Sequence, residues 1–201
     1  MRLVLASRSA SRMAILSAAG VAFDAVPADL DEESVMVRMA GSPLHDIAST
    51  LALQKALSVS QDLPDDLVLG CDSVVSVNGR IFSKPESRAE AENHLQAFSG
   101  QEMLLVSAAA LVGCGQAEQT IVDEAILSVR TLPETFIEAY LDAEWPAIAG
   151  CVGCFRMEGP GVHLFERVVG NHFTIVGMPL IGILAALRAN GHEPFARSAD
   201  A

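Results

Sequence analysis

The stretch from Leu67 to Pro85 (LVLGCDSVVSVNGRIFSKP) constrains the fold more than any other part of the sequence. It begins with an apolar run that predicts a buried strand, passes through Gly70, and continues as a second apolar strand over Val74–Val77. Asn78-Gly79 then separates this strand from Arg80–Ser83. Because a type I′ turn needs positive φ at both central residues, Asn-Gly between two β-rich runs predicts a tight β-hairpin.

The hairpin folds an acid and an amine toward the same end of its two strands. With Val77 opposite Arg80, strict pairing places Asp72 and Lys84 near the base of the arm. Strict alternation puts these two side chains on opposite faces, so a common site requires a β-bulge or a strand end there. Such a site would suit the activation of water beside a bound phosphate. From these residues alone, a solvated acid and a solvated lysine at an ordinary hairpin base remain the alternative.

Charge and length bound the class of protein. The 201 residues predict one domain, which we place at residues 1–191, followed by a loose tail at residues 192–201. The formal net charge is −12, and a surface this acidic repels polyanions. We therefore expect no nucleic-acid polymer and no anionic membrane as the main partner. A small anion remains compatible where a few cations converge or where a divalent metal accompanies it.

Apolar segments are too short to cross a membrane. The longest candidate, Leu104–Val112, is interrupted by Ser107 and falls below the ~18 residues that a spanning helix needs. Arg8 and Arg12 place two charges where a signal peptide needs its hydrophobic region. A cytoplasmic protein is the expectation.

The chain has four cysteines, of which Cys151 and Cys154 have CxxC spacing. This spacing occurs in redox motifs and in half of a zinc site, but no second CxxC follows. Cytoplasmic proteins rarely keep disulfides. We expect buried thiols here, with metal or redox use as the alternative.

The N-terminus predicts a strand, a polar turn and a helix. An apolar run at Arg2–Ala6 enters the turn Ser7–Ser11, and Arg12–Ala19 has apolar residues at helical spacing. Unpaired N–H groups at a helix N-terminus make such a turn a natural anion site. Its candidate residues are Ser7, Ser9, Ser11 and Arg12. A plain cluster of N-cap serines is the alternative.

Three further features of the sequence have both a functional and a purely structural interpretation. The acidic run Asp29–Glu33 is either a solvated face or a source of one ligand for a divalent cation. Lys55 lies near the end of an amphipathic helix predicted over Pro43–Ser58, where a lysine is usually solvated. Glu158–Gly161 (EGPG) predicts a tight turn whose glycines let the backbone approach something closely.

Helices and strands alternate along the chain, which predicts an α/β fold. The hydrophobic strand pair Met103–Val112 and Thr120–Val129 favours a mixed central sheet over a purely parallel one. Further helices are expected at Glu86–Phe98, from Pro133 to Ala143, and at Leu180–Ala189. A second strand is expected at Val21–Val26 and a late one at His163–Val169.

At this point the residues resemble the Maf family of nucleotide pyrophosphatases. Eight motifs match in order and spacing over roughly residues 2–191, and each alone is weak. They are LASRSASRMAIL at 5–16, QKA at 54–56, GCDSVV at 70–75, SKP at 83–85, FSG at 98–100, AG at 149–150, EGPG at 158–161 and VGMPL at 176–180.

The resemblance implies a mixed α/β fold with a central sheet flanked by helices and a cleft between two lobes, similar to the inosine-triphosphate pyrophosphatases. It implies cleavage of a nucleoside triphosphate between its α- and β-phosphates, with a divalent metal such as Mg²⁺ or Mn²⁺. Members are cytoplasmic and often dimeric, so a homodimer is one expectation. They are credited with removing non-standard nucleotides or with arresting division and septum formation.

Site residues follow from the matching motifs. The resemblance implies that Asp72 accepts the proton of the attacking water and that Ser7, Arg12, Lys55 and Lys84 contact phosphate. Glu32 falls near the family's acid after the second strand, so Glu32 and Asp72 are the candidate metal ligands. Phosphoanhydride cleavage needs charge neutralisation on phosphate and a base positioned for in-line water, which agrees with this set.

Within the family, the chain resembles the branch that acts on 7-methyl-GTP. That branch has glutamate where most members have glutamine, and Glu158 stands there, with Phe155 and Leu164–Arg167 as further matches. A carboxylate could accept from the N1 and N2 donors of guanine and offset the positive charge that N7-methylation adds.

Two positions depart from the family pattern. Ser11 stands where an arginine or the branch's tryptophan is usual, and Ser73 follows Asp72 where threonine or glutamine is usual. Ser11, Ser73 and Glu158 are therefore the candidate specificity residues. The loss of one cation motivates an alternative function, a catalytically weak nucleotide-binding regulator of cell division.

Overall fold

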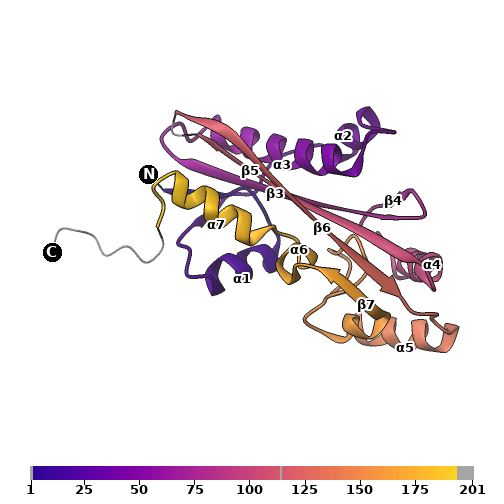
Figure 1. Cartoon of the computed structure of the whole chain (residues 1–201). Helices are drawn as coiled ribbons and strands as arrows, with labels where there is room; N and C mark the ends of the chain where they lie inside the picture. Colours follow the sequence, from indigo (N-terminus) through magenta and orange to yellow (C-terminus); the bar gives the residue numbers. More distant parts are fainter. Residues whose placement is uncertain (1, 114, 194–201) are drawn as a thin grey trace. The chain divides into compact units, whose positions relative to one another are not determined.

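The computed structural model describes residues 2–113 and 115–193 (Figure 1). Strands and helices alternate along this part of the chain. The strands are β1 (Leu3–Leu5), β2 (Asp24–Ala25), β3 (Leu67–Val77), β4 (Arg80–Phe82), β5 (Glu102–Gly113), β6 (Gln116–Val129) and β7 (Phe165–Gly170). The helices are α1 (Ala10–Ala18), α2 (Glu32–Arg38), α3 (Leu44–Ser60), α4 (Arg88–Phe98), α5 (Glu134–Glu144), the 3-10 helix η1 (Pro160–Leu164), α6 (His172–Ile175) and α7 (Leu180–Ala189).

The strands of the described residues form one mixed sheet in the order β2-β1-β3-β5-β6-β7, with β4 paired to β3. β1 runs parallel to both β2 and β3, whereas β4 is antiparallel to β3 and β7 is antiparallel to β6. The predicted mixed central sheet flanked by helices is confirmed.

The chain divides into two compact units, in agreement with the two expected lobes. The first comprises the described parts of residues 1–72, 108–122 and 177–201, and the second comprises Ser73–Ser107 and Asp123–Val176. β3, β5 and β6 each contribute residues to both units. The single domain at 1–191 and the cleft stay predictions, and most of the expected tail lies outside the described residues.

In the first unit, helices cover both faces of the sheet (Figure 1). α3 packs directly on β3, because a Cβ atom added at Gly70 would lie 2.1 Å from the carbonyl oxygen of Ala52 and 2.7 Å from the amide nitrogen of Ala56. On α7, a Cβ at Gly182 would lie 2.5 Å from a methyl group of Ile121. Glycine therefore lets both helices approach the sheet closely.

In the second unit, the predicted hairpin is confirmed. Val77 pairs with Arg80, and the pairing continues to Val75 and Phe82, where β4 ends. Asn78 and Gly79 have φ of 51° and 77°, as a type I′ turn requires. Behind the hairpin, the rings of Phe82 and Phe98 pack edge to face at 4.7 Å. Because β4 ends before Lys84, strand register does not extend to that residue.

Two local expectations were wrong. β3 runs without interruption from Leu67 to Val77, so Asp72 lies inside a strand and not at a strand end. The strand expected at Val21–Val26 contains only Asp24–Ala25. The acidic run is mostly exposed, as the solvated-face interpretation predicts, and it also begins α2: Asp31 accepts from the backbone N–H of Ser34 at 3.0 Å as N-cap, and acids in a first turn suit the helix dipole.

Among the described helices, none is long and apolar enough to cross a membrane.

Candidate active site

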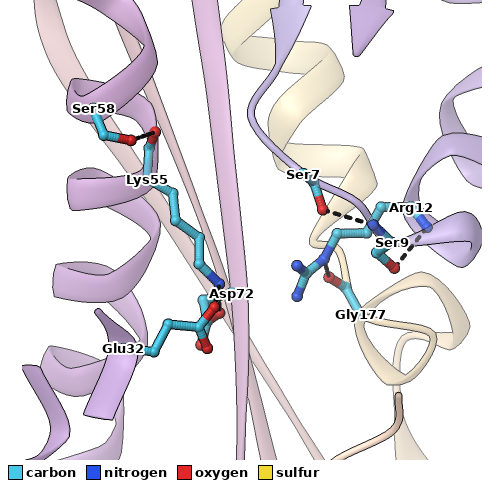
Figure 2. A network of polar contacts seen from close by, with 8 residues as sticks. All are labelled: Ser7, Ser9, Arg12, Glu32, Lys55, Ser58, Asp72 and Gly177. Carbon is cyan, nitrogen blue, oxygen red and sulfur yellow. Dashed lines mark hydrogen bonds and ion pairs between the residues drawn. The ribbon is translucent and has the colours of Figure 1, made fainter. Parts of the chain in front are cut away.

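A buried lysine joins two carboxylates in the first unit (Figure 2). Lys55 Nζ donates a short hydrogen bond to Asp72 Oδ1 and lies 2.9 Å from Glu32 Oε1. Lys55 and Asp72 are 7% and 6% exposed, whereas the side chain of Glu32 is 44% exposed. The site is therefore a buried ion pair next to α3 with a second, solvent-facing acid.

The packing of α3 on β3 explains why these side chains meet. Residues two apart on a strand share a face, so Asp72 lies on the same face as Gly70. That face touches Ala52 and Ala56 of α3, and Lys55 precedes Ala56 in the sequence. The structure excludes the alternative of a solvated Lys55, because its amine is buried and ion-paired with Asp72 and Glu32.

The two carboxylates also suit a divalent cation. The described residues contain no group of three or more histidine, cysteine, aspartate or glutamate side chains that could hold a metal. Mg²⁺ typically uses one or two protein carboxylates together with water and substrate phosphates. Glu32 and Asp72, held together by one lysine, fit that requirement.

The serine-rich turn before α1 is tied by its own hydroxyl groups (Figure 2). Ser9 Oγ accepts from the backbone N–H of Arg12 at 3.4 Å as N-cap, and Ser7 Oγ accepts from the N–H of Ser9 at 3.1 Å. The side chain of Arg12 donates through Nε to the carbonyl oxygen of Gly177 at 2.9 Å. Ser9 thus acts as the N-cap of α1 and Ser7 stabilises the turn before it, while phosphate binding by this turn stays a prediction, as does the role of Ser11.

Cys71 shows that two cations approach the same part of β3. Burial raises the pKa of its thiol to about 11, and the positive charges of Arg12 and Lys55 partly oppose this rise. Arg12, Lys55 and Asp72 therefore act electrostatically on one position of the strand. Hydrogen bonds and ion pairs in the first unit join Lys55, Asp72 and Glu32, whereas Arg12 is held separately by the carbonyl oxygen of Gly177 (Figure 2).

In the second unit, Ser73 begins a chain of buried hydrogen bonds. Ser73 Oγ lies 2.8 Å from Ser107 Oγ, and Ser107 Oγ donates to the carbonyl oxygen of Thr174 at 2.8 Å. Thr174 Oγ1 donates to Asp123 Oδ2 at 2.6 Å. Ser107 and Thr174 are fully buried. The position of Ser73 is therefore fixed by residues from three other segments.

Lys84 and Glu158 are exposed in the same unit. Both residues act electrostatically on Cys151. Burial is the largest cause that raises the pKa of this thiol; the charge of Glu158 raises the pKa further, and the charge of Lys84 lowers it. The approach of Lys84 to Asp72 stays a prediction.

Comparisons with known proteins agree with the sequence motifs. The family model described as Maf-like protein matches residues 2–190. A protein of Nitrobacter hamburgensis named nucleoside triphosphate pyrophosphatase is 41% identical over 189 residues, which cover 94% of each chain. The chain belongs to the Maf-like family.

Two other similar proteins differ in their sequence identity to this chain. A Brucella suis protein named 7-methyl-GTP pyrophosphatase is 40% identical to this Maf-like chain and covers 93% of it, with 95% of its own length aligned. The solved structure of the Staphylococcus aureus Ham1 protein has a TM-score of 0.45 at 16% identity, covering 64% of this chain and 72% of that chain.

The cysteines of this Maf-like chain are thiols wherever the structure describes them. Cys71, Cys151 and Cys154 are free, and Cys114 lies outside the described residues. Cys154 Sγ lies 3.6 Å from Nδ1 of His94, and both side chains are buried. Burial raises the pKa of Cys154 to about 12. The expectation of buried thiols is confirmed for Cys71 and Cys154, whereas Cys151 is partly exposed.

Sequence reasoning missed an ion pair in the second unit. Arg156 donates through Nε and Nη2 to the two carboxylate oxygens of Glu144, each at 2.9 Å. Glu144 is only 3% exposed. One signal was available: Glu144 follows Ile137, Tyr140 and Leu141 at helical spacing, so it lies on the apolar face of α5.

Proposed function

We propose that this protein hydrolyses the α-β phosphoanhydride of a nucleoside triphosphate, releasing a monophosphate and pyrophosphate. Relatives that are 40–41% identical across most of both chains are named pyrophosphatases, which supports this reaction class. The observation that carries the proposal is the buried Lys55–Asp72 pair with Glu32 beside it.

Asp72 acts as the general base in this proposal. A water oxygen attacks the α-phosphorus, and its proton passes to the Asp72 carboxylate. The new bond to the α-phosphorus forms as the bond to the α-β bridging oxygen breaks, and pyrophosphate leaves with that oxygen and its electrons. Such in-line transfer depends chiefly on positioning and on neutralising charge.

Lys55 has two roles because it stands between the two carboxylates. Without substrate, its ammonium group balances the buried charge of Asp72. When a phosphate arrives, the same ammonium group donates to phosphate oxygen and frees Asp72 to accept a proton from water. Ser7, Arg12 and Lys84 are the other proposed phosphate contacts, and their cations offset the charge of the triphosphate.

Glu32 and Asp72 are the side chains that would hold a divalent cation. Bound Mg²⁺ or Mn²⁺ would neutralise phosphate charge and orient the triphosphate. The half-exposed carboxylate of Glu32 suits a cation that arrives together with the nucleotide.

For the nucleobase we propose a 7-methyl-GTP-like substrate. Glu158 is exposed and its carboxylate can accept from the N1 and N2 groups of guanine while offsetting the charge of the methylated ring. The name of the Brucella suis relative supports this preference. Ser11 and Ser73 are the other proposed specificity residues. A cytoplasmic location and a homodimer remain part of the proposal.

The test is pyrophosphate release from 7-methyl-GTP, GTP, UTP, dTTP and CTP with Mg²⁺ or Mn²⁺. We expect release from at least one of them and a loss of at least about 100-fold in Asp72→Asn, the usual order for a missing general base. Asp62→Asn changes an exposed acid and serves as the matched control.

A second pair tests the metal. Glu32→Gln should raise the Mg²⁺ concentration needed for half-maximal rate, whereas Glu33→Gln, its exposed neighbour on α2, should not. Nucleotide binding without release from any substrate would contradict the enzyme and support the nucleotide-binding regulator of cell division.

A further inference from the structure

Glu158 lies in a tight turn that begins at Arg156. The backbone N–H of Gly159 donates to the carbonyl oxygen of Arg156 at 3.2 Å and closes the turn. The N–H of Val162 then donates to the carbonyl oxygen of Gly159 at 3.2 Å. Since the Glu158 side chain is exposed, its direction depends on how the ends of this turn are held.

Arg156, the first residue of the turn, is held by a buried carboxylate. Both oxygens of the buried Glu144 carboxylate accept from the guanidinium group of Arg156 at 2.9 Å. A two-pronged contact of this kind fixes the plane of the guanidinium group as well as its distance. Glu144 belongs to α5, whose apolar face includes Leu141 in the core of the unit. Arg156 is thus tied to the packed interior.

The rest of the turn packs against the same pair. A Cβ atom at Gly159 would lie 3.8 Å from Nη2 of Arg156 and 3.9 Å from Oε2 of Glu144, which is ordinary contact. A Cβ at Gly161 would lie 2.6 Å from the carbonyl oxygen and 2.7 Å from the amide nitrogen of Arg156. The glycines of the EGPG motif therefore fold the chain back onto Arg156, which is the close approach that the sequence predicted.

Charge links the clamp to Glu158 itself. The hydrogen bonds from Arg156 to Glu144 are the largest cause that raises the pKa of the guanidinium group, and the charge of Glu158 adds to it. The carboxylate of Glu158 thus lies within the electrostatic reach of Arg156.

We propose that Arg156, clamped by Glu144, is the positioning residue for the base-reading carboxylate of Glu158. This inference rests on the proposed function, in which Glu158 faces the nucleobase. Two donors of guanine can be accepted together only when the carboxylate plane is fixed, and the clamp supplies that constraint. Neither Glu144 nor Arg156 touches the substrate in this arrangement.

The test compares Arg156→Lys with Arg88→Lys. The first change keeps the charge and removes the two-pronged contact. The second changes an arginine of similar exposure that is paired with Asp142 at 2.6 Å. The readout is kcat/KM for 7-methyl-GTP divided by kcat/KM for GTP. We expect Arg156→Lys to lower this ratio by about tenfold, the order of one misplaced polar contact, and Arg88→Lys to leave it unchanged.

A double substitution separates positioning from a direct contact. Glu158→Gln should lower the same ratio, and Arg156→Lys added to Glu158→Gln should lower it no further, because both changes remove one interaction. An additive effect would overturn the inference.

Hydrogen exchange of the backbone gives a readout that needs no turnover. We expect the amides of Gly159 and Val162 to exchange faster in Arg156→Lys and in Glu144→Gln than in the wild type. An unchanged ratio in Glu158→Gln overturns the base assignment of the proposed function. A lowered ratio in Glu158→Gln combined with an unchanged ratio or unchanged exchange in Arg156→Lys overturns the inference alone.

Discussion

At the scale of single residues, Lys55 has the environment that most constrains the chemistry. An ammonium group that is 7% exposed is stable only with charged or hydrogen-bonding partners, and it has two. Asp72 is buried as well, whereas Glu32 remains open to water. This site is therefore in contact with solvent at Glu32.

Replacing Lys55 by methionine should separate its structural role from its proposed catalytic role. The change leaves the Asp72 charge buried without its cation, so we expect the free energy of unfolding to fall by about 3 kcal/mol. We also expect pyrophosphate release to fall by at least about 100-fold, because the phosphate loses its cation. Urea unfolding and an activity assay measure the two effects.

The double variant Lys55→Met/Asp72→Asn supplies the control. It removes both charges, so it should regain much of the lost stability and none of the activity. Recovery of activity would contradict the roles assigned to both residues.

His94 predicts how stability depends on pH. Burial lowers its pKa below the ordinary value of about 6.5, although the nearby charge of Glu90 opposes the shift. As the pH falls through about 6.5, the unfolded chain binds a proton that the folded His94 does not, so the folded state loses stability.

The free energy of unfolding should therefore fall less between pH 7.5 and 5.5 in His94→Leu than in the wild type. His163→Leu, which changes an exposed histidine, should behave like the wild type. Urea unfolding at both pH values measures the difference. Equal losses in wild type and His94→Leu would show that His94 binds a proton as readily in the folded state.

At the scale of elements, the contact between β3 and α3 creates the site. α3 approaches Gly70 closely, and the two atoms nearest to a Cβ at this position belong to the helix backbone. A side chain there cannot be accommodated by a rotamer change, since backbone must move. Movement of α3 would carry Lys55 away from Asp72.

Gly70→Ala should therefore destabilise the protein by about 3 kcal/mol, the upper range for overpacking, and should lower activity in the molecules that remain folded. Gly150→Ala is the matched control, because a Cβ there meets nothing within 4 Å. Urea unfolding and pyrophosphate release at low temperature measure both effects. Normal activity in folded Gly70→Ala would show that catalysis does not depend on the close contact between β3 and α3.

Elements with a local signal were predictable from the sequence. The Asn78-Gly79 turn follows from the φ values that a tight hairpin needs, and Leu180–Ala189 has the helix bounds that were predicted. The role of the acidic run was ambiguous, because the same local sequence is compatible with Asp31 as a helix N-cap and with Asp31 as a solvated acid.

The surroundings of site residues were predictable only in part. Lys55 and Asp72 are 17 residues apart, and whether the lysine is solvated depends on the packing of α3, which no local pattern encodes. The contact of His94 with Cys154 spans 60 residues and was not foreseen. Glu144 was marked by its position on the apolar face of α5, but its partner was not.

At the scale of the whole molecule, three strands link the two units. β3, β5 and β6 each run from one unit into the other, so loss of either unit removes pairing partners from strands of both. We expect the chain to unfold as one cooperative system.

The single tryptophan makes this testable. Trp145 packs against the core of the second unit, so its fluorescence reports on that unit, whereas far-UV circular dichroism reports on the helices of both. The two urea transitions should coincide. A fluorescence transition at lower urea would show that the second unit unfolds first.

The chain of buried hydroxyl groups behind Ser73 also has a direction. Ser107 carries one hydroxyl hydrogen, which goes to the Thr174 carbonyl oxygen because a carbonyl only accepts. Ser73 must then give its own hydrogen to Ser107, across 2.8 Å. Any other partner of the Ser73 hydroxyl has to be a donor, such as a sugar hydroxyl or an amino group. Ionised phosphate oxygens only accept, so under the proposed function Ser73, the residue after Asp72, would suit the nucleoside end of the nucleotide better than its phosphates.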